Sequence, residues 1–122
     1  MHENEISEKI IGAAIEVHRI LGPWLLESVY EEALCHELHL RGMHFSRQQN
    51  VPIPYKGIRL KTDLRLDLLV EDKVIVELKT AERLSIHHKA QLTSYLKASG
   101  YKLGILVNFS KSKVEYLRVV IR

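Results

Sequence analysis

Two short stretches of alternating hydrophobic residues constrain the fold of this chain more than any other feature. They cover residues 64–70 and 74–79, and Glu71, Asp72 and Lys73 lie between them. Apolar side chains at every second position are typical of a strand with one buried face. A connection of three residues therefore predicts an antiparallel hairpin.

The register of this hairpin places two carboxylates side by side. A three-residue loop pairs Val70 with Val74, which brings Asp67 directly opposite Glu77. Like charges in that arrangement destabilise a sheet, whereas a divalent cation between them would reverse the sign of the interaction. Lys79 shares the strand face of Glu77, where it can hold an attacking water or neutralise a phosphate. Solvated charges on an exposed strand are the plainer interpretation, but the apolar flanks indicate a buried strand.

The remaining pattern predicts a mixed α/β fold. Helices are predicted over 5–21, 24–41 and 86–99, and further strands over 45–54, 103–109 and 114–121. Asn4 can cap the first helix, and two prolines in the strand over 45–54 indicate an edge position. Lys56-Gly57 is a turn signal. The strand–helix–strand unit predicts one parallel pair with a right-handed crossover, whereas the hairpins are antiparallel.

Composition favours a single domain spanning residues 1–122. Hydrophobic residues make up 46% of the chain and charged residues 27%, which argues against a disordered or fibrous protein. Lys and Arg number 18 against 15 Asp and Glu, a net charge of +3 that is compatible with a polyanionic partner but does not identify one.

The location follows from what the sequence lacks. No apolar run approaches the ~18 residues that cross a bilayer, and the acidic N-terminus does not resemble a signal peptide. Cys35 is the single cysteine, so an intramolecular disulfide is excluded and a reducing compartment is expected. We therefore expect a cytoplasmic protein without membrane contact.

Other candidate site residues lie on the predicted helices. In the second helix, Glu27 shares the stripe of Leu34 and Leu38, so it either joins a site at the sheet edge or simply emerges into solvent, and Glu31 follows at i+4. Cys35 and His39 are spaced i, i+4 on the polar side of this helix. No orienting group for them is apparent, so a thiol enzyme is disfavoured.

The third predicted helix presents His88, Gln91 and Tyr95 at helical spacing. Gln91 can hydrogen-bond a phosphate or a metal-bound water, or it can simply lie at the rim of a helix that packs Tyr95. His87 precedes His88 directly, and adjacent side chains on a helix point apart, so a zinc site there is disfavoured.

Three motifs together resemble the PD-(D/E)XK nuclease superfamily. They are Asp67 followed after nine residues by Glu77-Leu78-Lys79, the segment Gly22 to Tyr30, and His88-x-x-Gln91-x-x-x-Tyr95-Leu96. The second motif resembles the one that names the bacterial GxxExxY proteins, a branch of that superfamily. Leu66 stands where the signature has Pro, and Trp24 stands where the resemblance leads us to expect Gly.

The resemblance implies a restriction-endonuclease-like α-β-β-β-α-β core, to which this chain adds an N-terminal helix and a C-terminal strand. It implies Mg²⁺ or Mn²⁺ at the acidic residues, Lys79 positioning the water, and Gln91 with Tyr95 at the wall of the site. The expected metal ligands are Asp67, Glu77, Glu27 and the backbone carbonyl of Leu78. The expected catalytic residues are Asp67, Glu77, Lys79, Glu27 and Gln91, and the expected substrate-binding residues are Tyr95, His88 and Tyr30.

The leading hypothesis is a metal-dependent phosphodiesterase of the nuclease type that acts on DNA, with RNA as the second choice. Two alternatives remain open: a non-catalytic nucleic-acid-binding module, and a protein-interaction subunit of a bacterial complex on the same fold. So small a chain has little room for its own specificity determinants, so we expect a homodimer or a protein partner.

Overall fold

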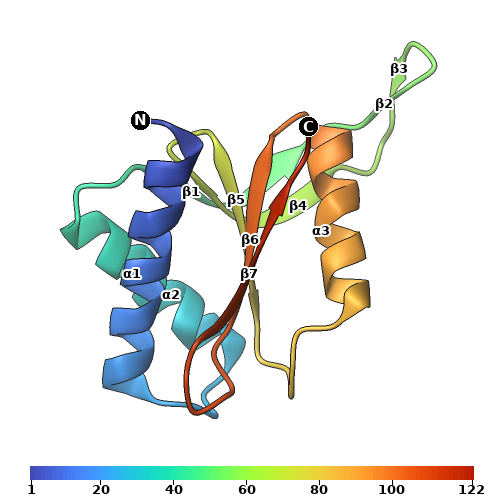
Figure 1. Cartoon of the computed structure of the whole chain (residues 1–122). Helices are drawn as coiled ribbons and strands as arrows, with labels where there is room; N and C mark the ends of the chain where they lie inside the picture. The colour runs from blue at the N-terminus through green and yellow to red at the C-terminus, as the bar shows by residue number, and fades with distance from the viewer.

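The computed structural model describes all 122 residues and places three helices around a five-stranded sheet (Figure 1). Two helices, α1 (Glu3–Leu21) and α2 (Glu27–Leu40), cover one face, and α3 (Ile86–Ser99) covers the other. The strands are β1 (Phe45–Val51), β2 (Pro54–Tyr55), β3 (Ile58–Arg59), β4 (Leu64–Val70), β5 (Val74–Lys79), β6 (Leu103–Asn108) and β7 (Glu115–Val120). No helix is both long and apolar enough to cross a bilayer.

The order of strands in the main sheet is β1-β4-β5-β6-β7. Only β5 and β6 are parallel, because α3 carries the chain back across the sheet between them. The other neighbours are antiparallel. The predicted mixed fold, the edge position of the first strand and the single parallel pair are all confirmed.

Two predicted boundaries are wrong for local reasons. The first helix begins at Glu3 because the ring of His2, not the side chain of Asn4, caps it: His2 Nδ1 accepts a hydrogen bond from the Asn4 N–H at 3.0 Å. The second helix begins at Glu27 rather than at residue 24 because the chain first makes a turn through Trp24, whose φ is 75°. That conformation favours glycine, which is the residue expected at this position.

The strand predicted over 45–54 ends early. β1 stops at Val51, and the chain then forms a separate two-stranded hairpin, β2 and β3, that projects away from the main sheet (Figure 1). Lys56 and Gly57 form its turn with φ values of 47° and 84°, so the predicted turn is confirmed. Pro52 has no N–H to donate, which ends pairing along the edge.

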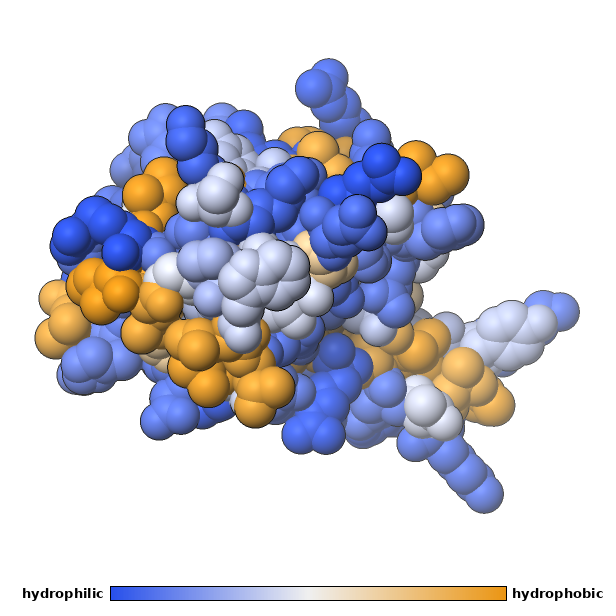
Figure 2. Space-filling view, turned by 90° about the horizontal axis from the view of Figure 1, so that it is seen from below, coloured by the Kyte–Doolittle hydropathy of each residue, from blue (hydrophilic) through white to orange (hydrophobic).

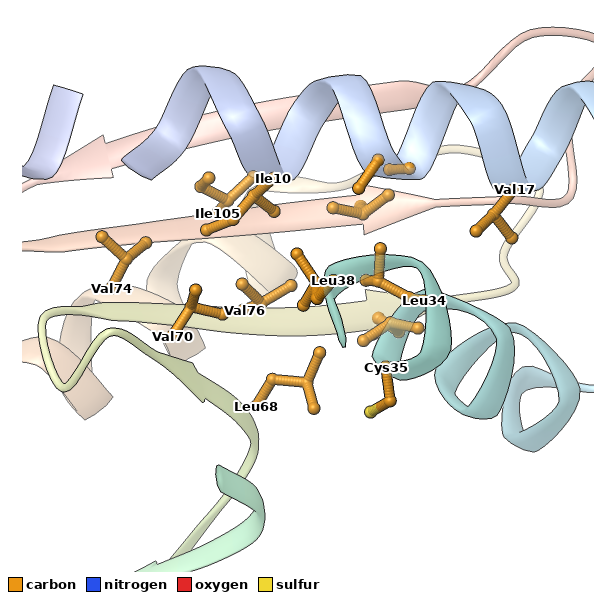
Figure 3. Packing of buried hydrophobic residues seen from close by; sticks show 14 of the residues in the cluster. Ile10, Val17, Leu34, Cys35, Leu38, Leu68, Val70, Val74, Val76 and Ile105 are labelled. Carbon is orange, nitrogen blue, oxygen red and sulfur yellow. The ribbon is translucent and has the colours of Figure 1, made fainter. Parts of the chain in front are cut away.

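The two faces of the sheet bury unequal cores. The face under α1 and α2 belongs to a cluster of 19 buried residues, and Figure 3 shows Ile10, Leu34 and Leu38 pointing from the helices toward the strands. The face under α3 belongs to a cluster of 7, centred on Leu92 and Leu96.

Cys35 lies in the larger core and not on the polar side of its helix. It is 7% exposed, and burial raises the pKa of its thiol to about 11. Since the thiolate is the nucleophile, a protonated buried thiol rules out the thiol chemistry that the spacing of Cys35 and His39 suggested.

Candidate active site

The β4–β5 hairpin has the predicted register and brings the two carboxylates together. Leu68 pairs with Val76 and Val70 with Val74. The regular ladder ends at the first of these pairs, and Asp67 and Glu77 follow next in register. Side-chain hydrogen bonds continue the contact between the strands beyond that point.

These hydrogen bonds are reciprocal. The Asp67 N–H donates to Glu77 Oε2 at 2.7 Å, and the Leu78 N–H donates to Asp67 Oδ2 at 2.8 Å. Each carboxylate is thereby held against the opposite strand by one oxygen. The second oxygen of each side chain, Asp67 Oδ1 and Glu77 Oε1, takes no part in these two hydrogen bonds.

Both carboxylates resist ionisation at this position. Glu77 is 5% exposed, and burial followed by repulsion from Asp67 raises its pKa to about 8. Burial also raises the pKa of Asp67, although the hydrogen bond from Leu78 opposes the shift. Two adjacent carboxyl groups whose pKa values are both raised are a place where a positive ion would be strongly stabilised.

Lys79 supplies the local positive charge. It lies two residues beyond Glu77 on the same strand and is half-buried, and its ammonium lowers the pKa of both Glu77 and Asp67. The end of its strand is fixed because the Phe109 N–H donates to the Lys79 carbonyl at 3.1 Å. The predicted placement of Asp67, Glu77 and Lys79 at one end of the sheet is therefore observed.

The two candidate acids of α2 have different surroundings. Glu27 is exposed at the first residue of the helix, and its pKa is raised by burial of its carboxyl group and by the nearby Asp67. Glu31 is buried and fully engaged, since it accepts hydrogen bonds from Arg47 and Gln48, each at 2.7 Å. Glu27 thus faces the carboxylate pair, whereas Glu31 fastens α2 to β1.

The three candidate residues on α3 also have different surroundings. Burial and the charges of Glu77 and Asp67 raise the pKa of Tyr95, which places its hydroxyl near the pair. The side chain of Gln91 is exposed one turn earlier in α3. The His88 ring accepts from the Ser85 N–H at 3.1 Å and so completes the cap of the helix.

The structure contradicts the expected role of Tyr30 in binding substrate and gives it a structural one. This side chain is fully buried, and its ring stacks on Phe109 with centroids 4.5 Å apart. Its hydroxyl donates to the Gly22 carbonyl and accepts from the Leu25 N–H. Since it has no exposed surface, Tyr30 shapes the turn before α2 and does not contact a substrate.

Sequence reasoning missed two residues that support the site. Gln48, on β1, helps to keep the pKa of Asp67 down, and its φ of 52° interrupts the strand beside that residue. Extending the register of the β4–β5 hairpin to β1 would have placed Gln48 beside Asp67. The fully buried Asn108 donates to the Ala81 carbonyl at 2.8 Å and accepts from the Ala81 N–H at 3.0 Å, which holds the loop after Lys79. Only the parallel pairing of β5 and β6 reveals that contact.

The residues present fit a divalent cation of the Mg²⁺ type, because two carboxylates lie side by side where negative charge is unfavourable. Mg²⁺ binds through one or two carboxylates and keeps several waters. No group of three or more His, Cys, Asp and Glu side chains gathers closely enough to hold an ion. Glu27 therefore does not complete the predicted set of ligands in this structure, and water would supply the remaining ligands.

Comparisons with known proteins show the family of the chain. A profile of the PD-(D/E)XK nuclease superfamily matches residues 4–119, and members of this superfamily generally use divalent metal ions. A comparison with curated proteins finds no match.

Solved structures share the fold. The crystal structure of SSO0001 has a TM-score of 0.61 at 23% sequence identity over 97% of this chain. The chain spans 58% of the length of SSO0001. The structure of LHK-Exo in complex with dAMP has a TM-score of 0.53 at 11% identity, covering 95% of this chain and 83% of the exonuclease, which comes from Laribacter hongkongensis.

The profile covers all three helices and nearly the whole main sheet, including both strands that carry the carboxylate pair. The fold that the resemblance implied is confirmed by the order of strands and by the solved structures. The chain belongs to the PD-(D/E)XK nuclease superfamily.

Proposed function

We propose that this protein is a divalent-metal-dependent nuclease that hydrolyses phosphodiester bonds in DNA, with RNA as the second choice. The observation that carries the proposal is the reciprocal hydrogen bonding of Asp67 and Glu77, with Lys79 at the end of the same strand. The dAMP bound to LHK-Exo is a deoxynucleotide, and it supports DNA as the first choice.

The reaction is hydrolysis at phosphorus. An oxygen of water forms a bond to phosphorus, the bond to the leaving oxygen breaks, and the leaving oxygen takes up a proton. A bound Mg²⁺ or Mn²⁺ supplies charge neutralisation on the phosphate oxygens. Asp67 and Glu77, with the Leu78 carbonyl, would hold it. Lys79 positions the attacking water and offsets the negative charge that develops on the phosphate.

The remaining candidates act around this centre. Glu27 bears a raised pKa beside Asp67 and suits a water-mediated contact to the ion or a proton transfer. Tyr95 and Gln91 offer a hydroxyl and an amide to the substrate phosphates from α3. His88 already caps the helix, and its ring can reach a substrate only by giving up that hydrogen bond.

Several finer assignments belong to the same proposal. We place the protein in the GxxExxY branch, because Glu27 and Tyr30 have the spacing of its motif and Trp24 has a glycine-like backbone conformation. A single domain over residues 1–122, a cytoplasmic location, and a homodimer or protein partner complete the proposal.

The test is cleavage of labelled single-stranded DNA, duplex DNA and RNA by the purified protein with Mg²⁺, with Mn²⁺ and with a chelator. We expect cleavage that requires the metal. Asp67→Asn and Lys79→Met should each lower the rate by about 100-fold or more, in line with the loss of one group that stabilises the transition state.

Matched variants separate this loss from general damage. Asp63→Asn removes an acid from the connection before β4, and Lys73→Met removes a lysine from the β4–β5 loop. Both should cleave at nearly the wild-type rate. Cleavage that survives unchanged in Asp67→Asn and Lys79→Met, or that persists in the chelator, would contradict the proposal.

A further inference from the structure

The only tryptophan of the chain is exposed in the turn that precedes α2. Trp24 is 81% exposed and lies three residues before Glu27 in the turn between α1 and α2. Its φ of 75° is costly for any residue with a side chain. A large aromatic residue that is both strained and solvated contributes little to folding, so its position requires another explanation.

The turn that carries Trp24 is fastened to the strand that carries Lys79. The buried hydroxyl of Tyr30 donates to the Gly22 carbonyl and accepts from the Leu25 N–H, on either side of Trp24. The ring of Tyr30 stacks on Phe109, whose N–H in turn donates to the Lys79 carbonyl. The backbone of the turn that carries Trp24 is therefore held near the end of β5.

A pocket of about 510 Å³ opens between this turn and the end of β5. It is lined by Trp24, Leu25, Thr80, Ala81, Glu82 and Ser110. Thr80 directly follows Lys79, so the pocket begins where the candidate active site ends. Figure 1 shows the three loops that supply these residues at the same end of the molecule, and Figure 2 views that end, where hydrophobic side chains gather among polar ones.

The lining suits a flat, uncharged ring. Trp24 and Leu25 contribute apolar side chains to it, and Thr80 and Glu82 contribute polar ones. A phosphate would be repelled by Glu82 and by the nearby Glu27, so the charged part of a nucleotide must lie toward Lys79. A nucleobase has the required shape, stacks on an indole, and carries N–H groups that a carboxylate accepts.

We propose that this pocket binds an unpaired nucleobase next to the scissile phosphate, with Trp24 as its stacking platform. The proposal rests on the proposed function for the identity of the ligand. It adds a substrate class, because a base can lie on the indole only when it is not paired and stacked within a duplex. Single-stranded or frayed ends are then the preferred substrates.

The test uses the intrinsic fluorescence of Trp24, which no other tryptophan obscures. The full chain is kept in a chelator, so that substrate binds without cleavage, and is titrated with single-stranded DNA and with an abasic strand of equal length. We expect the strand with bases to quench the emission. The abasic strand carries the same phosphates, and it should leave the emission nearly unchanged.

Variants then measure the contribution of the ring by anisotropy of a labelled strand. Trp24→Gly suits the backbone conformation and so should remain folded. It should bind single-stranded DNA about 10-fold to 100-fold more weakly, the range expected for one base on an aromatic ring. Trp24→Phe should retain most of the affinity, and abasic DNA should bind wild type and Trp24→Gly equally.

Each outcome of these experiments either supports or overturns the inference. Absence of quenching, or equal affinity of wild type and Trp24→Gly for the strand with bases, overturns the inference even if the protein cleaves DNA. Quenching that depends on bases supports the inference even if no cleavage is found, and in that case only the catalytic proposal fails. If Trp24→Gly changes an oligomer to a monomer by light scattering without altering base-dependent binding, the exposed face belongs to a second copy and the inference is wrong.

Discussion

The two faces of the main sheet differ in the size of the core that they bury and in the charged side chains that they carry. The face under α1 and α2 packs into a cluster of 19 buried residues, whereas the face under α3 packs into a cluster of 7. Ile75 belongs to the smaller cluster, and Glu77 and Lys79 continue the same strand face beyond it. Charge on a central strand is tolerable here because the opposite face, with Val76 and Leu78, lies in the larger core.

This division explains how so small a domain carries a costly site. A carboxyl group with a pKa near 8 is a liability for folding in the absence of a cation. The larger core supplies the stability that offsets it, and the smaller core leaves an open end where ligands have access. Substitutions in the larger core, at the carboxylate pair and in the smaller core each test this difference between the two faces.

The largest loss should come from the larger core. Leu38→Ala removes a fully buried side chain from α2 and should lower the free energy of unfolding by about 2–5 kcal/mol. Leu40→Ala, at a position 66% exposed on the same helix, should change it by less than about 0.5 kcal/mol. Urea denaturation measures both. Equal effects of the two variants would contradict the packing shown in Figure 3.

The next effect concerns pH. Unfolded Glu77 loses its proton near pH 4.5, whereas the folded protein retains it to about pH 8. The stabilisation by protonation is complete below pH 4.5 and is lost as the pH rises to about 8. Metal-free protein should therefore lose on the order of 3–4 kcal/mol of stability between pH 5 and 8.

Denaturation in a chelator across this range measures the slope. Glu77→Gln should remove most of it, and Glu82→Gln, on the exposed loop after β5, should preserve it. Excess Mg²⁺ at pH 8 should restore stability to the wild type, because an ion that binds the folded state stabilises it. Stability that rises from pH 5 to 8 would show that Glu77 ionises readily.

A smaller effect on stability is expected from a substitution in the core beneath α3. A Cβ at Gly104 would lie 2.7 Å from Cδ1 of the buried Leu92, so Gly104→Ala should force α3 away from β6 at a cost of about 1–3 kcal/mol. Gly12→Ala in α1 meets only the mobile end of Arg41 and should stabilise by about 0.5–1 kcal/mol. Thermal unfolding of both variants tests the difference, and a neutral Gly104→Ala would indicate that α3 packs loosely.

The smallest expected effect on stability distinguishes Tyr30 from Tyr95. Tyr30→Phe loses the hydroxyl that braces the Gly22–Leu25 turn, so it should cost about 1 kcal/mol of stability. Tyr95→Phe, near the carboxylate pair, should leave stability nearly unchanged and reduce cleavage instead. Comparing the melting temperature with the cleavage rate for each variant tests the assignment. A Tyr95→Phe variant that melts early but cleaves normally would reverse it.

Much of the site was predictable from sequence because it depends on short-range register. A three-residue loop and alternating side chains suffice to place Asp67 opposite Glu77, and strand pairing is strict wherever one face is buried. The same reasoning placed Lys79 correctly. The β2–β3 hairpin was missed because two residues per strand are too few to produce a periodic signal.

Residues outside the hairpin were harder to assign, because a helical wheel shows which side chains share a face but not what that face meets. Glu27 and Glu31 are one turn apart on α2, yet one is close enough to Asp67 for its pKa to be raised and the other binds Arg47 on β1. Tyr30 had the spacing of a site residue, and only the packing of its ring on Phe109 revealed a structural role.

The sequence by itself determined the class of fold, the hairpin register and the pairing of the two carboxylates, since these follow from periodicity and from the geometry of one short loop. Only the tertiary structure decided which acids and aromatic residues surround that pair, and that Trp24 is exposed in a pocket with the residues that follow Lys79. Those contacts join segments far apart in the chain, and they depend on how helices settle on a sheet. No local pattern encodes that packing.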